Sequence, residues 1–108
     1  MNPAILKTRY RMLPNQRAVT HQVAPSGAQQ TVQGCVRRPW TMAEIQQFAV
    51  GADVERSAFL LPVINVAVAI PVNGDKITDS KDNSAWTVKM VGRELEDSFY
   101  RCVCVKQK

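Results

Sequence analysis

Alternating apolar and polar residues predict extended strands along much of the chain. The alternation is clear over residues 16–23, where Val19 and His21 share one face of an extended segment. A second strand is predicted over residues 29–38, and the Ala-Pro-Ser-Gly sequence between the two predicts a turn. Pro39 ends the second strand because proline cannot donate a hydrogen bond to a sheet. This part of the chain therefore predicts a long hairpin.

The rest of the chain is also mostly extended in pattern. Residues 64–70 are apolar at nearly every position, which predicts a buried strand. Asn73 and Gly74 predict a tight turn, since glycine adopts positive φ at low cost, and another turn is predicted over residues 92–97. The remaining strands are predicted at residues 54–63, 76–78, 85–91 and 98–106. The fold class predicted is mainly β, a small antiparallel β-barrel or sandwich of about six strands in a single domain over residues 1–108.

One short helix is predicted between the strands, over residues 41–51. Thr41 is followed three residues later by Glu44, which is the pattern of a reciprocal capping box. Gly51 ends the segment, because glycine is favoured directly after a helix. One face of this helix carries Ile45, Phe48 and Ala49.

Composition and charge narrow the class of protein. Hydrophobic residues make up 45% of the chain, which is ordinary for a globular domain. The net charge of +5 favours a polyanionic neighbour. No apolar run is long enough for a membrane helix, and the start of the chain lacks the pattern of a signal peptide, so no membrane partner is expected. Three cysteines, an odd number, fit a reducing compartment better than a disulfide scaffold.

The cysteines and the single histidine are the first candidates for chemistry. Cys102 and Cys104 lie on one side of the last predicted strand, and with Cys35 and His21 they offer a possible zinc set. The spacing does not match the usual Cys-x-x-Cys pair, so buried cysteines that pack as small hydrophobic groups are the favoured interpretation. No catalytic motif surrounds His21, for which an exposed or hydrogen-bonded strand position is favoured over a catalytic one. We therefore expect no enzyme activity, metal or cofactor.

Phosphate, metal and nucleic-acid sites have weaker signals. The Asn73–Asp75 segment is too short for a phosphate-binding loop, and the acidic residues Glu94, Glu96 and Asp97 are expected in a solvated turn. A basic β-barrel is compatible with oligonucleotide binding, which needs exposed aromatic rings. Most of the aromatic residues occupy positions that alternate into a core; the full set is Tyr10, Trp40, Phe48, Phe59, Trp86, Phe99 and Tyr100. A small nucleic-acid-binding barrel therefore remains an alternative of another class.

The stretch from Phe59 to about Val105 resembles the head–tail joining proteins of tailed phages, also called head-closure or stopper proteins. The resemblance consists of four segments in order: Phe-Leu-Leu-Pro at 59–62, Pro-Val-Asn-Gly-Asp-Lys-Ile at 71–77, Trp-Thr-Val-Lys-Met-Val at 86–91, and Tyr-Arg-Cys-Val-Cys at 100–104. It covers under half of the chain and implies a six-stranded β-barrel or sandwich with long loops. In physical terms, Gly74 permits the turn, and the Asp75 side chain can bond the turn backbone.

The resemblance also implies a role and partners. It implies a structural virion protein, assembled in the host cytoplasm, that forms a homo-oligomeric ring at the phage neck, a hexamer or a dodecamer. Portal or adaptor subunits and tail proteins would contact the ring, and DNA would pass through its lumen without sequence-specific recognition. A tail terminator or minor tail protein is a second possibility within the same class of structural proteins.

Candidate functional residues follow from these expectations. Gly74 and Asp75 are expected to form the structural turn, and no catalytic or metal-binding residue is assigned. Arg37, Arg38 and Lys76 are candidates for contact with acidic partner subunits or DNA, although ordinary solvated charge is the favoured interpretation. The turns at residues 25–29 and 79–83 are candidate partner surfaces.

Overall fold

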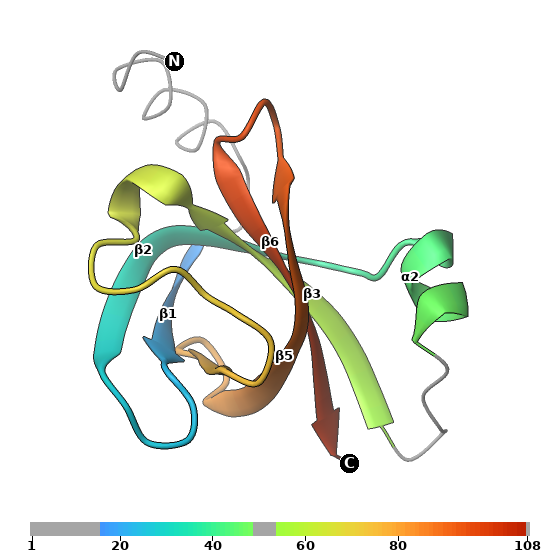
Figure 1. The fold of residues 1–108 in the computed structure, drawn as a ribbon, viewed down its shortest axis with the longest axis horizontal. Coiled ribbons are helices and arrows are strands. Elements are labelled where there is room, and N and C mark those ends of the chain that lie inside the picture. The colour runs from blue at the N-terminus through green and yellow to red at the C-terminus, as the bar shows by residue number, and fades with distance from the viewer. Residues whose placement is uncertain (1–15, 49–53, 108) are drawn as a thin grey trace.

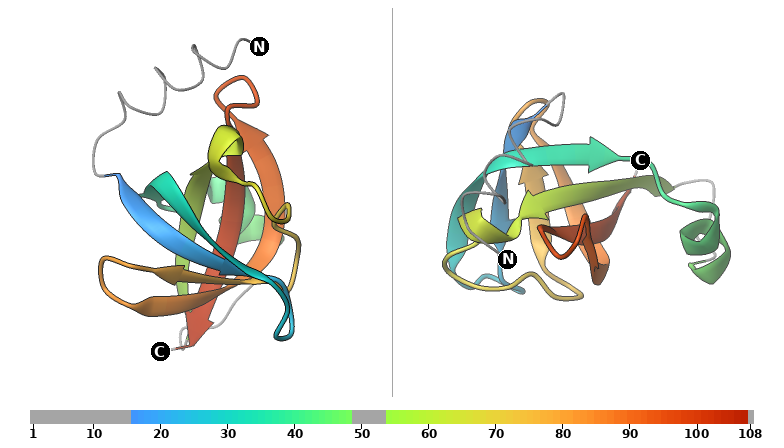
Figure 2. Two further views of the ribbon diagram at one scale, coloured as in Figure 1. Left: turned by 90° about the vertical axis from the view of Figure 1, so that its left-hand side faces the viewer. Right: turned by 90° about the horizontal axis from the view of Figure 1, so that it is seen from above.

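Six antiparallel strands close into one barrel in the computed structural model, which describes residues 16–48 and 54–107. The order around the barrel is β1-β2-β3-β6-β5-β4, and the views in Figure 1 and Figure 2 show the strands wrapping around a common interior. The strands are β1 (Arg17–Gln22), β2 (Gln29–Arg38), β3 (Val54–Pro62), β4 (Lys76–Asp79), β5 (Ser84–Glu94) and β6 (Phe99–Gln107). The predicted class, a small antiparallel β-barrel with one short helix, is confirmed.

Side chains fill the interior of the barrel. Phe59 and Trp86 meet there edge to face, with ring centroids 5.9 Å apart. The side chains of β3 alternate between two faces: Phe59 and Leu61 belong to the interior cluster, while Ala58 and Leu60 pack on the opposite face. The interior cluster consists of Val19, Val32, Cys35, Phe59, Leu61, Ile77, Trp86, Val88, Tyr100, Cys102 and Cys104. Since β3 and β6 are buried on both faces, these two strands are the centre of the fold.

The prediction of a buried strand over residues 64–70 is wrong. The segment begins with a single 3-10 turn, η1 (Val63–Asn65), and continues as an irregular loop over residues 66–75 that crosses one face of the barrel (Figure 1). Val68 and Ile70 are 56% and 58% exposed. The apolar run finds no partner strand among the described residues, and a glutamine side chain from β2 bonds its backbone instead.

The turn predicted over residues 92–97 also begins later than expected. β5 continues to Glu94, and the chain reverses at residues 95–98, where Leu95, Glu96 and Asp97 all have positive φ. β5 extends this far because β6 pairs with it up to the Glu94–Phe99 pair. A register shift between Val88 and Met90 marks a bulge in β5, so the alternation of its side chains between the two faces is interrupted there.

The helix α2 (Met42–Gln47) is shorter than predicted, and it stands beside the barrel (Figure 1, Figure 2). The capping box is confirmed, since the Thr41 amide donates to the Glu44 carboxylate and the Glu44 amide donates to the Thr41 hydroxyl. Phe48 follows the last turn, and its ring packs against that of Trp40. Ala49 and Gly51 lie outside the described residues, as do Tyr10 and the basic residues of the first segment, Lys7, Arg9 and Arg11.

Candidate interaction surfaces

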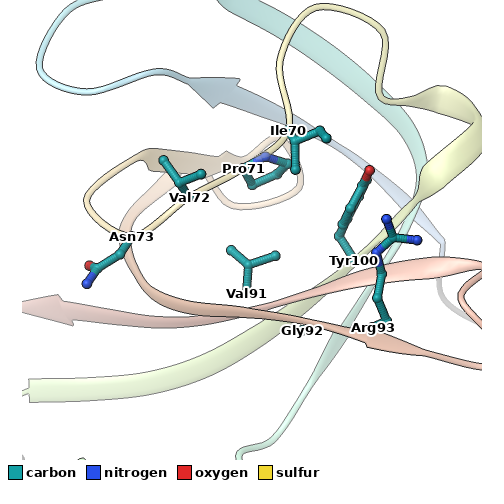
Figure 3. A pocket seen from close by; sticks show the side chains of 8 residues that line it. All are labelled: Ile70, Pro71, Val72, Asn73, Val91, Gly92, Arg93 and Tyr100. Carbon is teal, nitrogen blue, oxygen red and sulfur yellow. The ribbon is translucent and has the colours of Figure 1, made fainter.

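An apolar groove lies between the 66–75 loop and β5, with a cavity volume of about 410 Å³. Ile70 and Val72 from the loop face Val91 from β5 and Tyr100 from β6 (Figure 3). Ile70 and Val72 are 58% and 55% exposed, so their side chains reach the solvent at the mouth of the groove. Apolar residues of this kind on an open surface are suited to contact with another macromolecule.

Arg93 is the charged residue in the described lining of this groove. Its guanidinium carbon lies 4.4 Å from the centroid of the Tyr100 ring, a cation–π contact that holds the side chain at the rim. Its Nη1 also donates to the Asp97 carbonyl at 3.4 Å. The guanidinium remains exposed and keeps donors for a carboxylate from another chain.

Gln30, a buried residue of β2, anchors the loop that forms one wall of the groove. Its side-chain oxygen accepts hydrogen bonds from the amides of Ala67 and Val68, each at 3.0 Å. Its Nε2 donates to the Ala69 carbonyl at 2.7 Å. These three contacts define which end of the amide is oxygen and which is nitrogen, and they satisfy backbone groups that a sheet partner would otherwise bond.

The orientation of the Gln30 amide indicates which ring nitrogen of the fully buried His21 accepts a hydrogen bond. Gln30 Nε2 lies 2.9 Å from His21 Nδ1, so Nδ1 must be the acceptor. The other ring nitrogen, Nε2, is then the donor to Asp75, at 2.8 Å. Of the two positions expected for His21, the hydrogen-bonded one is confirmed, and the exposed one is wrong because the ring is fully buried. Among the described residues, no group of three or more His, Cys, Asp and Glu side chains is placed to hold a metal ion.

Asp75 ties the groove loop to the first hairpin. Besides the bond to His21, its carboxylate accepts from the amides of Ala24 and Val72, each at 3.0 Å. Burial alone would raise the pKa of Asp75. The hydrogen bonds from His21, Ala24 and Val72 together have a larger, opposite effect, so the pKa lies below its usual range. Beside it, Gly74 has φ of 98°, the positive value expected for this turn.

The three cysteines lie in the interior cluster and form no disulfide. Burial raises the pKa of the Cys102 thiol to about 12 and raises those of Cys35 and Cys104 well above their usual range. A protonated, buried thiol is a poor nucleophile. The geometry thus agrees with the interpretation of these residues as small hydrophobic groups.

The structure does not gather the three candidate basic residues into one patch. Arg37 is engaged within the chain, because it bonds the Ser57 hydroxyl at 2.7 Å, pairs with Asp82 at 3.2 Å, and lies over Trp86. Arg38 follows it on β2 and points to the opposite face of the sheet, half-buried. Lys76 is exposed at the start of β4, which lies beyond β1 in the strand order.

The candidate turns at residues 25–29 and 79–83 differ in exposure. The first is exposed over residues 25–29. The second begins one residue later than predicted, because Asp79 ends β4 and is fully buried in an ion pair with Arg17 at 2.6 Å. Residues 80–83 remain an exposed turn.

A buried ion pair that the sequence analysis missed fastens α2 to the barrel. Arg101 of β6 donates two hydrogen bonds to Glu44, at 2.7 and 2.9 Å, one to Glu94 and one to the Pro39 carbonyl. The hydrogen bond from Arg101 is the main reason why the pKa of Glu44 is lowered. An arginine among the apolar residues of the predicted last strand was the available signal. The outer surface of the helix exposes Met42 by 68% and Ile45 by 37%.

Comparisons of this chain with protein-family models, with curated proteins and with solved structures find no match. Within residues 16–48 and 54–107, no helix has the length and apolar character needed to cross a bilayer.

Proposed function

We propose that this chain is a structural virion protein of a tailed phage, a ring-forming head–tail joining component of the stopper or adaptor type. It would connect the portal complex to the tail as a homo-oligomer and surround the passing DNA. The proposal assigns it no catalytic step. A tail terminator or minor tail protein is the neighbouring alternative.

The observation that carries the proposal is the segment from Pro71 to Ile77. In the sequence, this segment has the Pro-x-x-Gly-Asp-x-Ile pattern that resembles the head–tail joining family. In the fold, Gly74 has positive φ, and the Asp75 carboxylate joins the turn to β1 and to the first hairpin. The other segments of the resemblance lie on β3, β5 and β6 of one barrel, in the same order. The pattern thus corresponds to a connected structural unit.

Exposed apolar residues support a role in assembly. They occur in three places among the described residues: on α2 at Met42 and Ile45, on the groove loop at Val68, Ile70 and Val72, and at Leu95 in the turn between β5 and β6. Subunits of a ring contact their neighbours through two different surfaces, so a ring needs separate patches of this kind.

Light scattering and negative-stain electron microscopy of the purified protein test the proposal. We expect a closed ring of uniform size, and we expect particles lacking the protein to carry heads and tails that do not join. A protein that stays monomeric at every concentration, and that is dispensable for joining heads to tails, would contradict the proposal.

The alternative of a nucleic-acid-binding barrel is tested by oligonucleotide titration at increasing salt. Base stacking needs open aromatic faces, whereas the described aromatic residues are buried or half-buried. Tight, salt-sensitive binding that is lost on replacing one aromatic residue would favour this alternative over the structural role.

A further inference from the structure

One side of β5 lacks a strand partner among the described residues. β4 has four residues and pairs with Ser84 to Thr87, while β5 has eleven. Val88 is still bonded on that side, because its carbonyl accepts from Gly74 and its amide donates to Asp75. From Met90 to Glu94, β5 pairs with β6 only, and Lys89 lies at the bulge just before this stretch. Alternate residues of this stretch therefore direct their amide and carbonyl groups to the unpaired side.

The apolar groove lies along this unpaired side of β5. Its walls are formed by the loop residues Ile70 and Val72 and by Val91 and Gly92 of the strand (Figure 3). A Cβ added at Gly92 would meet no atom within 4 Å, so the face of the strand at this residue is open. A glycine within a strand is typical of places where another backbone approaches closely.

We propose that the unpaired side of β5, from Lys89 to Glu94, binds an extended segment of another protein as an additional strand. Main-chain hydrogen bonds to β5 would supply affinity, and every second side chain of the segment would enter the groove between Val72 and Val91. The matching segment has apolar residues at alternate positions and a carboxylate that meets Arg93 at the rim.

Charge complementarity favours a foreign acidic segment over a second copy of this chain. Arg93 is the charged side chain of the described groove lining, so its complement is an aspartate or glutamate. Two copies pairing through the same edge would place an arginine on both strands and leave both without that complement. Such a contact would also be isologous, which closes a pair of subunits and does not extend to a ring. The proposal does not rest on the role at the phage neck.

Nuclear magnetic resonance of the full chain tests the proposal with a short synthetic peptide, capped at both ends, that alternates valine and threonine and contains one aspartate. We expect chemical-shift changes on peptide binding to be confined to residues 70–73 and 89–94. Hydrogen exchange of alternate amides in the 89–94 stretch should become about tenfold slower. Two N-methylated versions of the peptide serve as matched probes. Methyl groups on the residues whose amides pair with β5 should abolish binding, whereas methyl groups on the other residues should preserve it.

Two valines of the same loop provide a matched pair of variants. Val72 lines the groove and Val68 does not, although the two are 55% and 56% exposed. Both replacements by lysine should leave the fold intact, because each side chain is already largely in solvent. We expect Val72→Lys to abolish peptide binding and Val68→Lys to preserve it. Arg93→Gln should weaken binding of the aspartate peptide by roughly two- to fivefold, as expected for an exposed ion pair.

Three results would overturn the proposal. The first is the absence of shift changes at millimolar peptide. The second is equal affinity of the protein for the two N-methylated peptides, or equal affinity of the two valine variants for the unmodified peptide. The third is protection of the 89–94 amides that rises with the concentration of the protein alone, which would assign this edge to a second copy.

Discussion

The replacement Gln30→Leu tests the anchoring of the groove loop most directly. Leucine has a similar size but makes none of the four hydrogen bonds of the amide, which join it to Ala67, Val68, Ala69 and His21. The His21 ring is fully buried, so its Nδ1 acceptor would be left without water and would cost about 1–3 kcal/mol. The three loop bonds can be partly replaced by water and add about 0.5 kcal/mol each, the low end of the usual range.

The free energy of unfolding should therefore fall by about 3 kcal/mol, a large part of the stability of a small domain. Urea denaturation followed by tryptophan fluorescence measures this change. Hydrogen exchange of the Ala67 and Val68 amides should accelerate even where the barrel is intact, because both amides lose their acceptor.

The neighbouring residue provides the control. Gln29 is exposed on the same strand, and Gln29→Leu should change the unfolding free energy by no more than about 0.5 kcal/mol. A loss below about 1 kcal/mol for Gln30→Leu, with unchanged exchange at the two loop amides, would refute the assignment of Gln30 as the anchor.

Three further predictions concern the helix anchor, acid stability and the turn. Glu44→Ala should lower the free energy of unfolding by about 3–5 kcal/mol in urea denaturation, since it leaves the buried guanidinium of Arg101 without its main partner. As a control, Gln46→Ala on the exposed side of α2 should change this free energy very little. Equal effects of the two replacements would contradict the role of Glu44 as the helix anchor. The pKa values of Glu44 and Asp75 are lowered from 4.5 and 3.8, so their contribution is complete above these values and is lost as the pH falls below them. Stability measured against pH should thus decline below about pH 4.5, and less steeply in Asp75→Asn, whose stability will be lower at neutral pH; parallel curves would contradict this. Gly74→Val should lower the free energy of unfolding by about 1–3 kcal/mol through backbone strain, because φ is 98° while an added Cβ would have no neighbour closer than 4.0 Å. Gly74→Asn should lower it less, because asparagine tolerates positive φ better than valine. Thermal unfolding that ranks the two variants in the opposite order would contradict the strain explanation.

Patterns of neighbouring residues in the sequence were sufficient to locate most of the strands. The second predicted strand coincides with β2, since its alternation ends at a proline, and β4 and α2 were located by a Gly-Asp turn and a capping box. These signals depend on residues that are neighbours in sequence, and their physical causes act over one turn or one strand. The expectation of buried cysteines was equally local, because it depended on their spacing along one strand.

Patterns of neighbouring residues could not predict the groove. The apolar run at residues 64–70 has the composition of a buried strand, and it becomes a loop because Gln30, distant in sequence, bonds its backbone. The signal for the helix anchor was the charged Arg101 within an apolar strand, but its partner Glu44 lies 57 residues away. No period in the sequence predicts such a pair.

The sequence by itself determined a β-rich chain, the places where strands end, and a turn that needs positive φ, because these depend on backbone sterics and on side-chain alternation. Only the tertiary structure decided which apolar residues are covered. It made β4 too short to pair with all of β5, and it left the groove and an unpaired edge beside it. Burial depends on the relative positions of distant strands, and pairing of those strands is a property of the closed barrel rather than of any one segment.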